Sequence, residues 1–158
     1  RGLTPFSFLE TPMMRIIIGA LTALLVGAGA AATEAPSPIG RWLTKNGKSH
    51  VEIYQCGAQL CGRIVWLRDP HLRDGRTAID LNNPDPAKRG RPILGLEFLS
   101  NFTQSSAPGV WEGGRIYNPE DGEVYRGTIT AAPGGKLLLR GYVGIPLLGK
   151  SEEWHRVK

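Results

Sequence analysis

Few side chains in this sequence have the arrangement that enzymes use. The three histidines, His50, His71 and His155, fall in separate segments of the chain. Glu112 and Asp121 are carboxylates close to turns, and such a pair can perform acid–base catalysis. The spaced motifs of serine hydrolases, phosphate-binding loops, zinc proteases and dinucleotide-binding turns are all missing. We therefore predict no catalytic residues, no cofactor and no metal, and an enzyme is the weakest of the three functions considered below.

The N-terminal segment has the pattern of an export signal. Met14 and Arg15 precede an uninterrupted apolar run from Ile16 to Val26, and a tract of glycine and alanine follows. A basic start, a short apolar region and a small-residue cleavage site are typical of a secretory signal peptide. We predict a signal peptide over residues 1–32.

Cleavage is expected after Ala32, with Ala30 and Ala35 as alternatives. After cleavage we expect no stable membrane span, so the mature protein is expected in the periplasm or secreted; an uncleaved transmembrane anchor is the alternative. Residues 1–12 precede two methionines, and we expect them to be absent from the natural product. Residues 33–38 are predicted to form a stiff linker because they contain two prolines.

Export bears on the two cysteines, Cys56 and Cys61, because disulfides persist in oxidising compartments. Four residues separate them, which differs from the Cys-x-x-Cys spacing of thioredoxin-like redox sites and zinc knuckles. Strand-like patterns flank both cysteines. We predict a disulfide across the mouth of a β-hairpin, and redox activity is the less favoured alternative.

The charge pattern bears on partners. The chain carries 19 lysines and arginines against 14 aspartates and glutamates, which gives a net charge of +5. The basic residues are scattered, with one cluster from Lys88 to Arg91. A mild and scattered excess is typical of a solvated surface, so we expect no nucleic-acid partner. The oligomeric state is left open.

The mature chain alternates between apolar and polar residues with the period of two that is typical of β-strands. Asn46 and Gly47 form a typical two-residue hairpin turn. Within one predicted strand, Ile64 and Trp66 are expected on one face and Val65 on the other. The predicted strands before the last stretch cover residues 39–44, 49–56, 61–67, 92–102, 110–117 and 123–130.

A long polar segment from Arg68 to Arg91 interrupts this pattern, and segments of this length are often binding loops. The last stretch, Lys136 to Val157, contains an apolar strand, a bend at Gly144–Pro146 and a closing strand. An apolar strand at the free edge of a sheet would promote aggregation, so we predict that this terminal strand pairs with residues 39–43. That pairing gives an all-β, antiparallel up-and-down barrel of eight or nine strands over residues 39–158; a sandwich is the alternative.

The order of these blocks resembles a known family. The segments that carry the resemblance are GRWLTKNGKSHVEIYQCGAQLCGRIVWL, DLNNPDPAKRGRPILGLEFL, WEGGRIYNPEDGEVYRGTI and LLLRGYVGIPLLGKSEEWHRV. They cover residues 39–157, and the sequence is identified as a member of DUF2147, a family of small exported bacterial proteins. The resemblance implies a lipocalin-like β-barrel and brings no established biochemical activity. Residues 39–42 also resemble the Gly-x-Trp of the first lipocalin strand.

The resemblance to lipocalins also implies how the barrel is closed. In that fold a tryptophan near a strand end, with an arginine across its ring, acts as a closure device. We expect Trp42 to take this role, with either Arg140 or Arg156 against its ring. Trp154 lies two residues before Arg156 and is expected on the same face.

A closed barrel offers its interior for a ligand, and we predict binding of a small apolar or amphiphilic molecule such as a fatty acid or another lipid. One alternative is an envelope interaction module with a filled barrel, acting through loop 68–91; the weaker alternative is an envelope enzyme. Exposed Leu147 and Leu148 would provide a patch for a partner, a membrane or a ligand. The candidate lining residues are those expected on the inward face: Ile53, Val65, Trp66, Phe98, Trp111, Tyr117, Tyr125 and Tyr142. Core packing is the alternative role for the tryptophans.

Overall fold

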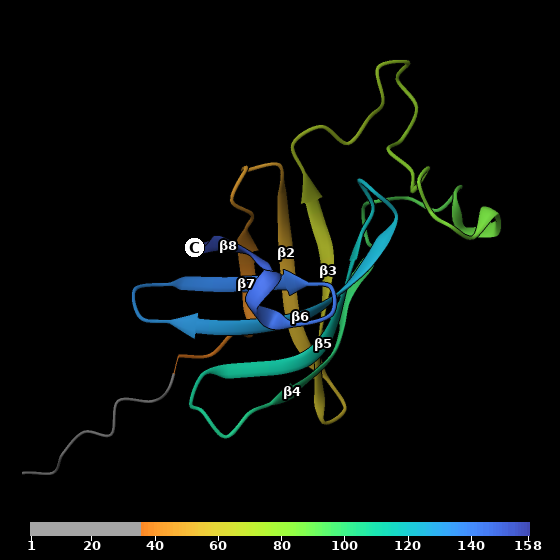
Figure 1. The fold of residues 1–158 in the computed structure, drawn as a ribbon. Coiled ribbons are helices and arrows are strands. Elements are labelled where there is room, and N and C mark those ends of the chain that lie inside the picture. The colour runs from red at the N-terminus through yellow and green to blue at the C-terminus, as the bar shows by residue number, and fades with distance from the viewer. Residues whose placement is uncertain (1–35) are drawn as a thin grey trace, which may run out of the picture. The chain divides into compact units, whose positions relative to one another are not determined.

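The protein folds into a closed β-barrel, which we describe for residues 36–158 in a computed structural model (Figure 1). Two single turns of 3-10 helix lie in its connections, η1 (Pro86–Lys88) and η2 (Pro146–Leu148). The predicted signal peptide lies outside the described residues. The strands are β1 (Gly40–Leu43), β2 (Ser49–Cys56), β3 (Gln59–Leu67), β4 (Glu97–Gln104), β5 (Val110–Asn118), β6 (Glu123–Ala132), β7 (Lys136–Tyr142) and β8 (Lys150–Arg156).

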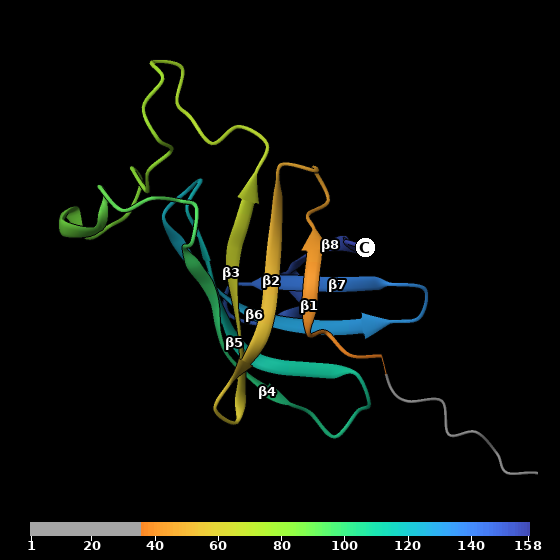
Figure 2. The same cartoon turned by 180° about the vertical axis from the view of Figure 1, so that it is seen from behind.

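Each strand pairs antiparallel with the next, and the last strand returns to the first (Figure 2). In the closing pair, Trp42 of β1 lies opposite Arg156 of β8, and Leu43 lies opposite His155. This confirms the predicted up-and-down barrel and the predicted pairing of the terminal stretch with the first strand. Because the barrel is closed, no sheet edge is left free.

The strand predicted over residues 92–102 is wrong at its start. β4 begins at Glu97, and the residues before it belong to the long connection from β3, where Pro92 forms an isolated bridge with Ile79. Proline lacks the N–H that a ladder needs, and Gly95 has a φ of +87°, which is outside the β region. Of the two leucines in this segment, Leu96 is buried and Leu94 is 49% exposed.

A β-bulge in β3 makes the predicted side-chain alternation wrong there. The pairing with β2 shifts from His50–Trp66 to Val51–Ile64, so Val65 has no partner across the ladder. The extra residue moves the following side chains to the other face. Ile64 is therefore buried, whereas Trp66 is 41% exposed and stacks on the outside against His50, with 4.4 Å between ring centroids.

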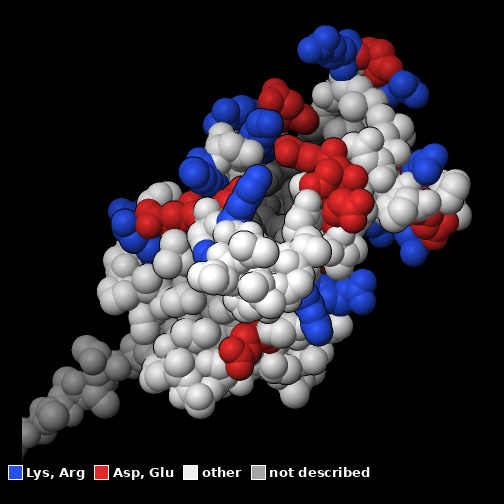
Figure 3. Space-filling view, in the orientation of Figure 1, with Lys and Arg blue, Asp and Glu red and all other residues white. Residues whose placement is uncertain are grey.

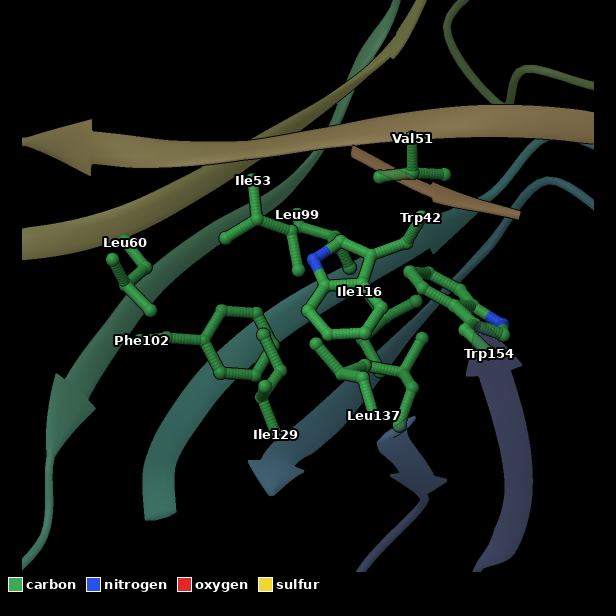
Figure 4. Packing of buried hydrophobic residues seen from close by; sticks show 11 residues of the cluster. Trp42, Val51, Ile53, Leu60, Leu99, Phe102, Ile116, Ile129, Leu137 and Trp154 are labelled. Atoms are coloured by element: carbon green, nitrogen blue, oxygen red, sulfur yellow. The ribbon is translucent and has the colours of Figure 1, made fainter. Parts of the chain in front are cut away.

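The hydrophobic core lies toward the end of the barrel that carries the β2–β3 hairpin. Figure 4 shows how its side chains pack against one another. The ring of Phe102 lies over Gly114 and Gly127, which pair with each other across β5 and β6. A Cβ atom on Gly114 would overlap this ring, so the two glycines provide the space that the ring fills. The buried cluster consists of Trp42, Val51, Ile53, Leu60, Leu99, Phe102, Ile116, Ile129, Leu137, Leu139 and Trp154.

The same end carries the disulfide. Cys56 and Cys61 are bonded across the β2–β3 hairpin, which confirms the predicted bridge. Within residues 36–158, no helix is long and apolar enough to cross a membrane.

Candidate ligand-binding cavity

The other end of the barrel is hollow. A cavity of about 770 Å³ opens between the β1–β2 hairpin, the long β3–β4 loop, the β5–β6 turn and the β7–β8 connection. Figure 3 shows this hollow with acidic and basic side chains along its rim. The barrel thus has a packed half and a half with room for a molecule.

The inner wall of the cavity is apolar and is drawn from six strands. The rings of Phe98 and Trp154 lie against each other there, with 6.4 Å between their centroids. Bulky aliphatic and aromatic side chains in a concave site bind the apolar part of a ligand. The wall residues, one from each strand in the order β3 to β8, are Ile64, Phe98, Ile116, Tyr125, Leu139 and Trp154.

Gly141 of β7 explains part of the hollow. A Cβ atom there would lie 3.6 Å from Cδ1 of Ile116 and 3.7 Å from Cβ of Tyr125, which are ordinary contact distances. The nearest ring atom to this Cβ is Cγ of Tyr125 at 4.0 Å, whereas a Cβ atom on Gly114 would overlap the Phe102 ring. A glycine that faces this open space enlarges the cavity instead of accepting a core side chain.

The mouth carries more acidic than basic side chains. Four carboxylates line it, on Asp69, Glu120, Asp121 and Glu152, against two lysines. Lys48 is already paired with Glu120, at 3.7 Å across the mouth between the β1–β2 hairpin and the β5–β6 turn. The field at the entrance therefore favours a neutral or cationic group over an anion.

Hydrogen bonds hold two of these carboxylates against aromatic residues of the wall. The indole nitrogen of Trp154 donates to Oε2 of Glu152 at 3.2 Å, and the Tyr125 hydroxyl donates to Oδ2 of Asp121 at 2.8 Å. Burial raises the pKa of Asp121, but hydrogen bonds from the Glu123 backbone, Tyr125 and Asn118 outweigh it and lower the pKa overall. Asp121 is therefore ionised at neutral pH.

A buried carboxylate anchors the long loop to the barrel wall. Asp80 is fully buried and accepts three side-chain hydrogen bonds: from the Tyr117 hydroxyl at 2.6 Å, from Asn83 at 2.8 Å and from Nε of Arg91 at 2.8 Å. The Arg91 guanidinium also lies 5.3 Å from the centre of the Tyr117 ring. Since Tyr117 belongs to β5, this cluster fixes the loop beside the mouth.

The cluster shifts the pKa values of its members in opposite directions. Burial raises the pKa of Asp80, but the hydrogen bonds from Tyr117, Asn83 and Arg91 outweigh it, so the pKa lies below the usual range. Burial and the hydrogen bond to Asp80 raise the pKa of Tyr117. Asp80 is therefore charged and paired throughout the neutral range. Among the described residues, no group of His, Cys, Asp and Glu side chains is arranged to hold a metal ion.

The closed end is covered by Trp42 and one of the two candidate arginines. The Arg156 guanidinium lies 4.3 Å from the centre of the Trp42 ring and donates to the carbonyls of Ser37 and Ile39. The Trp42 indole nitrogen donates to the Pro38 carbonyl at 2.7 Å. A Cβ atom on Gly40 would clash with the guanidinium, which explains the glycine two residues before the tryptophan.

Arg140, the other candidate, lies elsewhere, so its predicted role in closure is wrong. Its guanidinium donates to the carbonyls of Pro146 and Leu147 and to the Ser151 hydroxyl. β7 carries Arg140 on its outer face close to η2, because the inward positions of this strand are Leu137, Leu139 and Gly141. Trp154 contributes to the core and also to the cavity wall.

The eight predicted lining residues divide into two groups. Phe98, Tyr117, Tyr125 and Tyr142 line the cavity. The remaining four lie elsewhere: Ile53 in the packed core, Val65 at the bulge, Trp66 on the outer surface and Trp111 against the core. A single sequence does not show how far along the barrel axis each residue lies. It therefore does not distinguish inward residues of the packed half from inward residues of the hollow half.

Several residues of the cavity are not among the predicted lining residues. Ile64 was predicted to share a face with Trp66, and the bulge places the two side chains on opposite faces. Nothing in the residue types or the spacing of Gly141 and Glu152 indicates a cavity. Ile116 follows the exposed Arg115, so the period of two marks it, whereas Leu139 ends the continuous apolar run 137–139, in which the sequence does not distinguish the two faces. The sequence pattern alone does not show which of the two faces of each strand points into the barrel.

The side chains considered for catalysis are not assembled. His50 stacks on Trp66 outside the barrel. Asp121 lines the mouth, whereas Glu112 does not line the cavity and lies near the start of β5. Six strand residues between Glu112 and the end of β5 correspond to roughly 20 Å, which is too far for a shared proton transfer.

Comparison with known proteins agrees with this architecture. A family model described as "Uncharacterized protein conserved in bacteria (DUF2147)" matches residues 40–156. The chain belongs to this DUF2147 family. A solved structure with 26% identity and a TM-score of 0.65, covering 79% of this chain and 84% of the other, is that of Helicobacter pylori HP1028, whose title states that it belongs to the lipocalin family. The comparison with curated proteins found no significant match. The DUF2147 barrel is thus lipocalin-like in fold.

Proposed function

We propose that this DUF2147 protein binds one small amphiphilic molecule in the hollow half of its barrel. The observation that carries the proposal is the 770 Å³ cavity, with an apolar wall from six strands and a polar mouth. This volume lies within the usual range of small-molecule sites, roughly 300–1,000 Å³. The lipocalin-like fold is compatible with such a ligand.

The charges of the mouth narrow the class of ligand. A chain lying against Phe98 and Trp154 would bring its polar end to Glu152, which is exposed to solvent. The carboxylate of a fatty acid would meet Glu152 and Asp121 with like charge. A neutral hydroxyl or a cationic amine would donate to them instead, so we propose an alcohol-like or amine-like head group.

The two alternatives have less support. A filled barrel acting through loop 68–91 would leave no cavity of this size, and in the structure the loop is fixed to β5 through Asp80. An envelope enzyme would need an assembled pair of catalytic groups, and Glu112 and Asp121 do not form one.

The location also belongs to the proposal. The predicted signal peptide and the bonded Cys56 and Cys61 support a protein of the periplasm or the medium, because disulfides are retained in oxidising compartments. Fractionation of cells that express the full gene tests this. Recovery of the protein from the cytoplasm with reduced thiols would refute it.

Isothermal titration calorimetry with decanol below its solubility limit, and with decylamine and decanoate below their micellar concentrations, tests the ligand class. We expect saturable one-to-one binding, with decanoate weaker than the other two by roughly tenfold. Glu152→Gln should reduce the preference for the amine. The matched control is Glu153→Gln, because Glu153 lies outside the cavity and pairs with Lys136 at 3.1 Å. Absence of binding for all three compounds would refute the proposal.

A further inference from the structure

The connection between β7 and β8 exposes large apolar side chains beside the cavity mouth. Val143 is 71% exposed, Ile145 56%, Leu147 82% and Leu148 76%. Isolated exposed apolar residues are common on soluble proteins, but four within six residues form a patch that needs a partner. We name residues 143–148 the apolar rim.

The apolar rim is held in place with its side chains outward. The Arg140 guanidinium, at the base of the rim, donates to the Pro146 carbonyl at 2.6 and 2.9 Å and to the Leu147 carbonyl at 3.2 Å. Backbone hydrogen bonds from Leu148 to Ile145 and from Gly149 to Pro146 complete the turn of η2. These hydrogen bonds fix the backbone of the rim, so its leucine side chains remain exposed to solvent.

Basic side chains adjoin the apolar rim. The register places Arg115 of β5 opposite Arg126 of β6, and Arg126 opposite Tyr142 of β7, which is the residue before the rim. Lys150 follows the rim on the other side. Within residues 36–158, Arg115, Arg126 and Lys150 form no ion pair. The space-filling view shows Lys and Arg side chains, together with Asp and Glu side chains, around the uncharged surface at η2 (Figure 3).

Apolar tips with an adjacent tyrosine and unpaired arginines match the chemistry of one surface, the interface of an anionic lipid bilayer. Leucine and isoleucine side chains enter the boundary between head groups and acyl chains, tyrosine prefers the head-group level, and basic groups contact the lipid phosphates. We propose that the apolar rim docks the barrel onto an anionic membrane surface with the cavity mouth beside it.

This inference rests on the proposed function, because docking would bring the mouth to the source of its amphiphilic ligand. Val143 and Leu148 line the cavity as well as the rim, whereas Ile145 and Leu147 belong to the rim alone. Docking and ligand binding can therefore be separated by mutation. Ile145→Ser/Leu147→Ser should weaken docking and leave calorimetric binding of decanol unchanged.

Flotation with lipid vesicles tests the proposal, using protein isolated from the envelope or medium of expressing bacteria. We expect binding to vesicles of phosphatidylethanolamine and phosphatidylglycerol, and little binding to phosphatidylcholine alone. Ile145→Ser/Leu147→Ser should weaken the partition by roughly tenfold, and added salt should weaken it further. The matched control is Leu81→Ser/Leu94→Ser, since these leucines are 52% and 49% exposed and lie on the long loop away from the rim.

Three outcomes would overturn the docking proposal. The first is a wild-type protein that does not float with anionic vesicles, and the second is a rim variant that floats as well as the wild type. The third is a dimer in sedimentation without lipid that the rim variant abolishes, which would assign the rim to a second copy of the chain. If decanol binds in each case, the proposed function stands while docking fails.

Discussion

The guanidinium of Arg156 covers the Trp42 ring at 4.3 Å, and so joins the last strand of the barrel to the first. Its donors also reach the carbonyls of Ser37 and Ile39, which precede β1. One side chain therefore ties together the linker, β1 and β8 at the packed end. The cavity opens at the opposite end, beside the long β3–β4 loop.

Removing this closure should cost stability without touching the cavity. Arg156→Ala loses a cation–π contact and two charged hydrogen bonds, so we expect the free energy of unfolding to fall by about 1–3 kcal/mol. Urea denaturation measures the change. Arg41→Ala is the control, because Arg41 is exposed and makes a single 3.7 Å ion pair, so its loss should cost at most about 0.5 kcal/mol. Equal effects of the two substitutions would contradict the closure role.

The packed half should not tolerate a single added methyl group. Gly114→Ala places a Cβ atom inside the space of the Phe102 ring, and we expect destabilisation of about 1–3 kcal/mol from overpacking. Gly90→Ala adds the same group in open space and should change stability by less than about 0.5 kcal/mol. Thermal or urea unfolding of both variants compares them, and a stable Gly114→Ala protein would show that the ring has room to move.

The loop anchor should fail in acid. The pKa of Asp80 is lower in the folded protein than its unfolded value of about 3.9, so its stabilising contribution is complete above that value. The contribution is lost as the pH falls through the lower folded pKa. We expect hydrogen-exchange protection of the Asp80 and Ile93 amides, which bond to Arg91 and Ala78, to decline below about pH 4.

Asp80→Asn should loosen these amides already at neutral pH. Loss of the charged hydrogen bonds corresponds to roughly a tenfold or larger drop in protection. The variant should then lack the acid transition of the wild type in this loop. Asp74→Asn is the control, because Asp74 is exposed and pairs within the loop tip with Arg76. An unchanged acid profile in Asp80→Asn would show that another group anchors the loop.

Much of the fold was predictable from local patterns. The period of two located most strands, Asn46-Gly47 located the first hairpin, and the apolar terminal strand implied its pairing with the first strand. The Cys56–Cys61 bridge followed from the spacing of the cysteines and from the predicted export signal. These features depend on neighbours in sequence or on one strong constraint, so a single sequence contains them.

The candidate site was less predictable, because it depends on relations between distant strands. The bulge at Val65 places Ile64 and Trp66 on opposite faces of β3, and no glycine or proline in the sequence indicates it. The choice between Arg140 and Arg156 depends on which end of each strand lies near Trp42. The anchor between Asp80 and Tyr117 spans 37 residues and appears in the sequence as an ordinary polar loop. Each of these features becomes visible once the register is known.

Blocking the cavity tests the central claim most directly. Gly141→Phe directs a ring into the hollow, where a Cβ atom has ordinary contact distances, and Leu138→Phe places the same ring on the outer face of the same strand. Calorimetric titration with decanol, on variants whose circular dichroism matches the wild type, compares them. We predict that Gly141→Phe abolishes binding and that Leu138→Phe binds as the wild type does. Undiminished binding to folded Gly141→Phe would contradict the cavity as the ligand site.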